Sequence, residues 1–168
     1  MKTVPIVFAF DNNLVLPACI CISSLLMNAK EDTFYDIFIL HSSKIDLHKG
    51  QLDELPNYFK RCRIQYRVVD NTFDQAFEIR GITAATYYRL LIPELIPEYD
   101  KVIYTDVDII FRMDLSELYN TEIGDNYIAA TRELGMNLTE DGQKYIHSIS
   151  RLGVGNYIQA GFIITIVR

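Results

Sequence analysis

The stretch KVIYTDVDIIF, residues 101–111, is a short and largely apolar run that carries two carboxylates, Asp106 and Asp108, one residue apart. On a regular β-strand both acids would face the same side, because strand side chains alternate with a period of two. Neighbouring carboxylates repel each other, and a divalent cation relieves this repulsion because hard cations take oxygen ligands. The stretch therefore predicts a buried strand that ends at a metal site. A strand that ends in a solvated acidic turn is the open alternative.

The length and composition indicate one globular domain, residues 1–168. The chain is 49% hydrophobic and 23% charged, which is ordinary for a folded domain of this size. A net charge of -6 argues against nucleic acid as a partner, because phosphate binding needs basic patches. The three cysteines are expected to be reduced. No signal-peptide pattern and no apolar run of membrane-spanning length is seen, so we expect a cytoplasmic protein without a transmembrane segment.

Strand patterns alternate with helix patterns along the chain, which predicts an α/β fold with a largely parallel sheet and right-handed crossovers. Expected strands are residues 4–10, 35–41, 62–69, the central run, 109–112, 127–131 and 160–167. Expected helices are residues 17–29, a segment from Ser42 or Ser43 to 59, 84–91, ended by Pro93, a turn at 115–119, and 139–152. The three histidines, His41, His48 and His147, are expected at exposed positions.

Polar side chains follow several of the expected strands: Asp11, Asn13, Asp70, Asp106 and Asp108. In open α/β sheets, ligands bind outside the carboxyl ends of the strands. Arg89 is the nearest plausible cation. This convergence predicts a site for a metal and an anionic group.

Two phosphate-related interpretations compete for these residues. The segment VFAFDNNL, residues 7–14, resembles the N-terminal F-D-x-D motif of haloacid-dehalogenase-like phosphatases, in which the first Asp is the nucleophile and the second the general acid. Here Asn13 stands at the second position and cannot deliver a proton. That interpretation also expects Thr after its D-x-D, whereas Ile109 follows Asp108.

The second interpretation comes from an ordered set of segments: VFAFDNN (7–13), ITAATYYRL (82–90) and DKVIYTDVD (100–108). Together they closely resemble glycosyltransferase family 8, the retaining enzymes that include lipopolysaccharide galactosyl- and glucosyltransferases and glycogenin. The similarity continues through DLSEL (114–118) and GDNYIAA (124–130) to QAG (159–161), and so covers essentially the whole chain. The resemblance implies a GT-A type, Rossmann-like fold with a mostly parallel sheet flanked by helices.

The resemblance also implies a donor site. Ala9, Asp11 and Asn13 would line the uridine pocket, where Asp11 can accept a hydrogen bond from the uracil imide. Asp106 would touch ribose and metal, Val107 would lie at the donor, and Asp108 would coordinate Mn²⁺ or Mg²⁺. A helix-capping role for Asp11 remains open. Leu14 stands where family members often place an aromatic residue that stacks on uracil.

Three further residues are assigned to catalysis by the same resemblance. Arg89 would clamp the donor diphosphate or sugar through its planar guanidinium, although a surface helix arginine is the alternative. Glu133 occupies the place of an acid near the donor sugar. Gln159 stands where an Asn or Asp usually precedes Ala-Gly or Ser-Gly.

The implied reaction is transfer of a hexose from UDP-glucose or UDP-galactose to a saccharide or lipopolysaccharide acceptor, with Mn²⁺ or Mg²⁺ as cofactor. Family members continue for roughly another hundred residues beyond a domain of this size. That portion supplies a third metal ligand, most acceptor contacts and a possible peripheral membrane contact, so the chain is expected to be C-terminally truncated. A truncated or degenerate module that binds a UDP-sugar without activity is therefore the alternative function.

Overall fold

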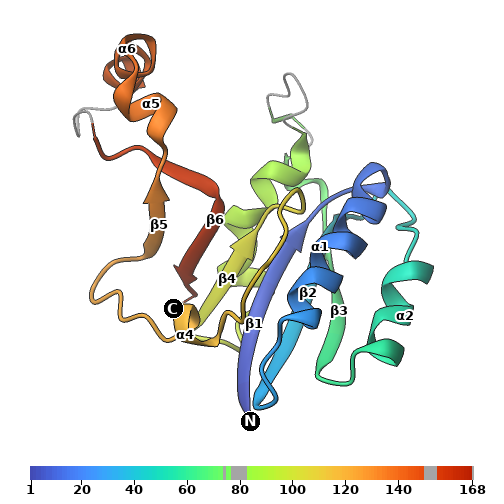
Figure 1. The fold of residues 1–168 in the computed structure, drawn as a ribbon. Coiled ribbons are helices and arrows are strands. Elements are labelled where there is room, and N and C mark those ends of the chain that lie inside the picture. Colours follow the sequence, from blue (N-terminus) through green and yellow to red (C-terminus); the bar gives the residue numbers. More distant parts are fainter. Residues whose placement is uncertain (74, 77–82, 150–154, 168) are drawn as a thin grey trace.

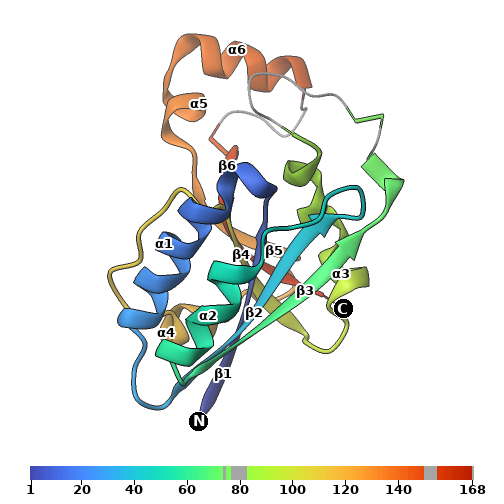
Figure 2. The ribbon, with the colours of Figure 1, turned by 90° about the vertical axis from the view of Figure 1, so that its right-hand side faces the viewer.

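The computed structural model describes residues 1–73, 75–76, 83–149 and 155–167. A six-stranded sheet forms the middle layer, with α1 and α2 on one face and η3 and α3 on the other (Figures 1 and 2). The strands are β1 (Lys2–Ala9), β2 (Thr33–Ser42), β3 (Cys62–Val69), β4 (Lys101–Thr105), β5 (Ile128–Arg132) and β6 (Ile158–Ile166). The helices and 3-10 turns are η1 (Asn12–Leu14), α1 (Val15–Met27), α2 (Gly50–Tyr58), η2 (Asn71–Phe73), η3 (Ala84–Leu91), α3 (Ile92–Leu95), α4 (Ser116–Tyr119), α5 (Leu134–Leu138) and α6 (Glu140–Ile149).

The strand order is β3-β2-β1-β4-β6-β5. The first four strands are parallel, β6 runs antiparallel to β4, and β5 runs antiparallel to β6. The carboxyl ends of the four parallel strands therefore lie at one edge of the sheet. Helices α5 and α6 follow β5 and stand beyond this edge (Figures 1 and 2).

Strand β1 is apolar from Val4 onward because both of its faces are covered there. Val4, Ile6 and Phe8 pack in the cluster beneath α1 and α2, and Val7 packs in the cluster beneath η3 and α3. This is the pattern of a central parallel strand between two helical layers. The sequence-based expectation of a Rossmann-like α/β architecture is confirmed, with the antiparallel pair β5 and β6 added at one side.

Several boundaries differ from the sequence-based prediction. Ser42 ends β2, and its Oγ accepts a hydrogen bond from the Lys44 backbone N–H at 3.1 Å, so α2 begins only at Gly50. Pro93 does not end a helix but lies in the first turn of α3, where its missing N–H costs no hydrogen bond. Helix α1 begins two residues before Pro17. The short helix α5 was not predicted.

The expected small strand at residues 109–112 is a loop. Two of its apolar side chains still reach the core, because Phe111 is buried and Ile109 is partly buried, whereas Ile110 is exposed. The backbone N–H of Phe111 donates to Ser24 Oγ at 2.9 Å, and its carbonyl accepts from Asn28 Nδ2 at 3.2 Å. Side chains of α1 thus satisfy groups that a neighbouring strand would otherwise satisfy.

Other expectations have mixed outcomes. Cys21 and Cys62 are buried, Cys19 is partly buried, and all three are free thiols. His41 was expected to be exposed but is buried in β2. Residues 150–152 of the expected last helix lie outside the described part of the chain. No helix among the described residues is long and apolar enough to cross a membrane.

Candidate functional site

Two pockets lie at the carboxyl edge of the parallel strands and share Thr83 and Ala85, so they adjoin. The first, about 520 Å³, is called here the Asp11 pocket. It is lined by Phe10, Asp11, Ser42, Lys44, Ile45, Phe73, Ala76, Thr83, Ala84, Ala85 and Tyr88. The second, about 330 Å³, is called the Asp106 pocket. It is lined by Ala9, Leu14, Thr83, Ala85, Thr86, Arg89, Tyr104, Asp106, Val107 and Asp108.

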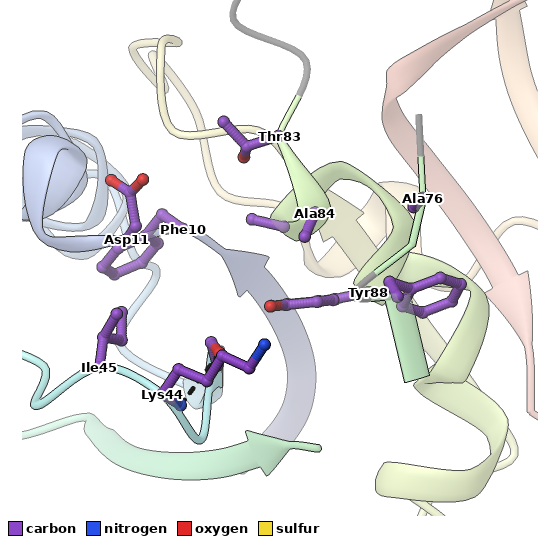
Figure 3. A pocket seen from close by; sticks show the side chains of 11 residues that line it. Phe10, Asp11, Lys44, Ile45, Ala76, Thr83, Ala84 and Tyr88 are labelled. Carbon is purple, nitrogen blue, oxygen red and sulfur yellow. Dashed lines mark hydrogen bonds between the residues drawn. The ribbon is translucent and has the colours of Figure 1, made fainter. Parts of the chain in front are cut away.

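The Asp11 pocket combines aromatic rings with one carboxylate. Figure 3 shows Asp11 and Phe10 on one side of the space and Tyr88 on the other, with the Tyr88 hydroxyl pointing into it. Asp11 caps η1: its Oδ1 accepts from the backbone N–H of Asn13 at 2.9 Å, and its Oδ2 accepts from Asn13 Nδ2 at 3.4 Å. Asn13 thus orients the Asp11 carboxylate at the pocket, and the capping alternative describes part of the local geometry.

Lys44 brings a cation to the Asp11 pocket that the sequence did not indicate (Figure 3). It lies in the turn after β2, which was predicted as the start of a helix. Tyr88, also absent from the predicted site, reaches the pocket from η3 and is largely buried. The sequence alone could not show that Tyr88, and not its neighbour Tyr87, would line this pocket.

The acids of the Asp106 pocket lie just beyond β4, which ends at Thr105. The main chain of Asp106 still pairs with β6, because its N–H donates to the Gly161 carbonyl at 2.8 Å. Continuing the β1–β4 register of Val7 opposite Tyr104 by two residues puts Ala9 level with Asp106. Asp106 and Asp108 line the same pocket, as predicted, although a turn rather than a regular strand brings them there.

The two oxygens of Asp106 have different surroundings. Oδ1 accepts hydrogen bonds from the Tyr104 hydroxyl at 2.9 Å and from Arg89 Nη2 at 3.2 Å. No described residue donates a hydrogen bond to Oδ2. The side chain is 41% exposed, so a ligand in the pocket can reach the carboxylate. Tyr104 was missed by the prediction, although its position two residues before Asp106 puts it on the same side of the strand.

Arg89 is held on all sides rather than reaching out into solvent. Its Nε donates to the Thr86 carbonyl at 2.8 Å, Nη1 donates to the Ala160 carbonyl, and Nη2 binds Asp106. Its guanidinium carbon lies 4.4 Å from the centre of the Tyr104 ring. The side chain is only 13% exposed. Arg89 therefore joins η3, β6 and Asp106 at the pocket wall, and it is not a surface helix arginine.

Asp108 is exposed and Val107 is buried between the two acids. No described residue donates a hydrogen bond to the Asp108 carboxylate. Carboxylate oxygens of Asp106 and Asp108 in one pocket suit a hard divalent cation. No group of three or more His, Cys, Asp or Glu side chains that could hold a metal occurs in the described ranges.

Glu133 and Gln159 lie outside the two adjoining pockets. Glu133 caps α5 by accepting from the Met136 backbone N–H, and it lines a separate open groove of about 920 Å³ with Tyr145 and Tyr157. Gln159 lies in β6, where its Oε1 accepts from the Gly161 N–H. Asp70 is exposed after β3 and lines neither adjoining pocket.

Curated relatives share the sequence over most of this chain. General stress protein A of Bacillus subtilis is 31% identical over 135 residues, which cover 74% of this chain and 46% of that protein. A putative glycosyltransferase of Haemophilus influenzae is 29% identical over 146 residues, covering 85% and 43%. The chain thus spans a little under half the length of these relatives.

Solved structures agree in fold. Galactosyltransferase LgtC, in complex with donor and acceptor sugar analogs, matches with a TM-score of 0.80 at 27% identity, covering 98% of this chain and 58% of that chain. The apo structure of the bifunctional glycosyltransferase WbbM matches with a TM-score of 0.79 at 26% identity, covering 99% and 32%. The expected GT-A fold is therefore confirmed. The model of glycosyl transferase family 8 matches residues 5–167, and the chain belongs to that family.

Proposed function

We propose that this chain carries the donor half of a retaining hexosyltransferase, which moves glucose or galactose from a UDP-sugar to a saccharide acceptor with the help of a divalent metal. The observation that carries the proposal is the pair of adjoining pockets at the carboxyl edge of the sheet. One contains aromatic rings and Asp11, and the other contains Asp106 and Asp108. A nucleoside diphosphate has the matching parts, a flat base at one end and a charged diphosphate at the other.

The Asp11 pocket fits the base. Tyr88 brings an aromatic ring to the pocket wall, and the Asp11 carboxylate, oriented by Asn13, can accept a hydrogen bond from the uracil imide. Leu14 lies in the neighbouring Asp106 pocket rather than at this ring surface. In this proposal Tyr88 takes over the contact that the aromatic residue of other family members makes with the base.

The Asp106 pocket fits a metal-bound diphosphate. Oδ2 of Asp106 and the Asp108 carboxylate are hard oxygen ligands without a hydrogen-bond donor among the described residues. A divalent cation held there supplies Lewis-acid stabilisation of the negative charge that develops on the departing diphosphate. Arg89 keeps Asp106 in place and neutralises Oδ1, and its positive charge lies where the donor diphosphate would bind.

Glu133 and Gln159 are proposed to act on the sugar side, nearer the acceptor. Glu133 lines the groove beside α5 and α6, and Gln159 lies in β6 next to the contacts of Asp106. The lipopolysaccharide acceptor and the choice between glucose and galactose belong to the same proposal. Membership of glycosyltransferase family 8 replaces the phosphatase alternative.

Calorimetric titration with UDP, with and without Mn²⁺, tests the proposal. We expect Mn²⁺ to tighten UDP binding by about tenfold or more, and Asp108→Asn to remove this gain, since tenfold corresponds to about 1.4 kcal/mol of metal-mediated contact. Asp32→Asn is the matched control, because Asp32 is an exposed acid at the opposite edge of the sheet, paired with Lys2 at 4.0 Å. Binding that ignores both Mn²⁺ and Asp108→Asn would rule out the metal-dependent transferase.

The second candidate is a module that binds the UDP-sugar without transferring it. The number of metal ligands favours it, because the described residues place two acids and no third metal ligand in the Asp106 pocket. The same titration followed by incubation with UDP-glucose or UDP-galactose together with a saccharide acceptor separates the two. Mn²⁺-dependent UDP binding with no release of UDP from either donor indicates the module.

A further inference from the structure

The Tyr104 hydroxyl makes one hydrogen bond that bears on the metal site: it donates to Asp106 Oδ1 at 2.9 Å. We propose that Tyr104 is a positioning residue that, together with Arg89, binds Oδ1 of Asp106 and so fixes the orientation in which this carboxylate meets a metal-bound donor. This inference rests on the proposed function, because it assigns the Tyr104 hydroxyl a task in metal and donor binding.

Tyr104 is itself rigidly placed. It is 1% exposed and lies opposite Val7 in the β1–β4 ladder. The guanidinium carbon of Arg89 stacks over its ring, 4.4 Å from the ring centre. A hydroxyl on a fixed ring can donate in few directions. The hydrogen bond therefore restricts the rotamer of Asp106 before any ligand binds. A ligand group fixed in advance loses less side-chain entropy on binding, which strengthens the complex.

Gly161 closes the other side of the carboxylate. A Cβ at Gly161 would lie 2.6 Å from Asp106 Oδ2, closer than any ordinary contact. The carboxylate thus lies directly against the β6 backbone, while Tyr104 and Arg89 hold its other oxygen. These contacts come from three separate elements, η3, β4 and β6, and together they fix the carboxylate at the wall of the Asp106 pocket.

The variant Tyr104→Phe tests the proposal, because it removes only the hydroxyl and keeps the ring beneath Arg89. Tyr119→Phe is the matched control: its hydroxyl donates to the Lys101 carbonyl at 3.0 Å, at the opposite end of the same strand. The measured quantity is the ratio of UDP affinities with and without Mn²⁺. We expect Tyr104→Phe to lower this ratio about tenfold, as for a lost hydrogen bond to a charged group, and Tyr119→Phe to leave it unchanged.

If Tyr104 had a purely structural role, Tyr104→Phe would weaken UDP binding equally with and without Mn²⁺, and that result would overturn the proposal. A variant whose ratio of the two UDP affinities equals that of the wild type would overturn it as well. If Mn²⁺ does not change the UDP affinity of the wild-type chain, the proposed function fails. The positioning role of Tyr104 is then tested separately, by crystal structures of the unliganded wild type and of Tyr104→Phe. An Asp106 carboxylate that turns away from Arg89 in the variant supports positioning. A carboxylate that keeps its place refutes it.

Discussion

At the scale of single residues, the contact between Gly161 and Asp106 makes a sharp prediction. An alanine Cβ at position 161 would lie 2.6 Å from Asp106 Oδ2 and 2.9 Å from Gln159 Oε1. Both atoms are the far ends of side chains, so the backbone of β6 can stay while the two side chains move. We expect Gly161→Ala to lower the free energy of unfolding by only about 1–2 kcal/mol, within the usual cost of mild overpacking, and to weaken Mn²⁺-dependent UDP binding more than about tenfold.

Thermal unfolding and UDP calorimetry measure the two effects of Gly161→Ala separately. Gly50→Ala is the control, because a Cβ at this first residue of α2 meets no atom within 4 Å. It should keep UDP binding and leave stability equal or slightly raised. Retained Mn²⁺-dependent binding in Gly161→Ala would show that the position of Asp106 against β6 is unimportant for the donor.

At the scale of elements, Asp114 connects segments far apart in the chain. Its Oδ2 accepts from the Lys30 backbone N–H and from the Tyr35 hydroxyl, both at 3.0 Å, and its Oδ1 accepts from the Ser116 N–H at 2.8 Å. The carboxylate thus joins α4, β2 and the turn after α1. We expect Asp114→Asn to lower the free energy of unfolding by about 1–2 kcal/mol at neutral pH, since the amide nitrogen cannot accept these bonds.

The pH dependence of this effect follows from the pKa of Asp114. Partial burial raises this pKa, but the hydrogen bonds from Ser116, Lys30 and Tyr35 outweigh it and lower it to about 2. The unfolded chain has a pKa of about 3.9 at this residue. Its stabilisation is therefore present above pH 4 and lost as the pH falls toward 2. Denaturant unfolding should show the difference between wild type and Asp114→Asn shrinking over that range.

Glu117→Gln is the control for Asp114→Asn. Glu117 pairs with Lys30 on the same surface, but its side chain is 81% exposed. Exposed pairs contribute little, so its loss should fall within the error of the unfolding measurement. An effect of Glu117→Gln as large as that of Asp114→Asn would show that surface charge, not the hydrogen bonds accepted by Asp114, stabilises this junction.

The elements also show what the sequence could predict. Strand β3 has the predicted bounds because its strand pattern begins at Cys62 and stops at Asp70. Ser42 misled the prediction of α2, because a serine that caps a helix and one that closes a turn after a strand look alike in the sequence. The loop at 109–112 has a strand's apolar pattern, and only the tertiary contacts of Phe111 with α1 distinguish the two.

The candidate site was predictable where residues follow strands and unpredictable where the contact is made across elements. Asp11, Asp106 and Asp108 lie at the expected edge because strand ends determine their place. The hydrogen bond from Arg89 to the Ala160 carbonyl depends on the tertiary packing of η3 beside β6. The position of Lys44 depends on the turn after β2, and no local sequence pattern describes that turn. The assigned roles of the site residues remain predictions.

At the scale of the whole molecule, buried and partly buried tyrosines connect the layers of the fold. Burial raises the pKa of Tyr35, Tyr66, Tyr99, Tyr104 and Tyr119, and a neighbouring carboxylate raises it further in each case. Two examples are the Tyr99 hydroxyl, which donates to the buried Asp36 at 2.6 Å, and the Tyr66 hydroxyl, which donates to Asp53 at 2.6 Å. The folded state therefore keeps these phenols protonated at a pH where the unfolded chain would ionise.

This difference predicts an alkaline limit to stability. A raised pKa in the folded state gives stability that is complete below the unfolded pKa of about 10 and is lost as the pH rises above it. One such group gives a slope of about 1.4 kcal/mol per pH unit, and five together should give a steeper one. In an alkaline titration, the tyrosinate absorbance of these five residues should appear together with the loss of far-ultraviolet circular dichroism. Complete ionisation of all eleven tyrosines in a chain that keeps its native dichroism would contradict this.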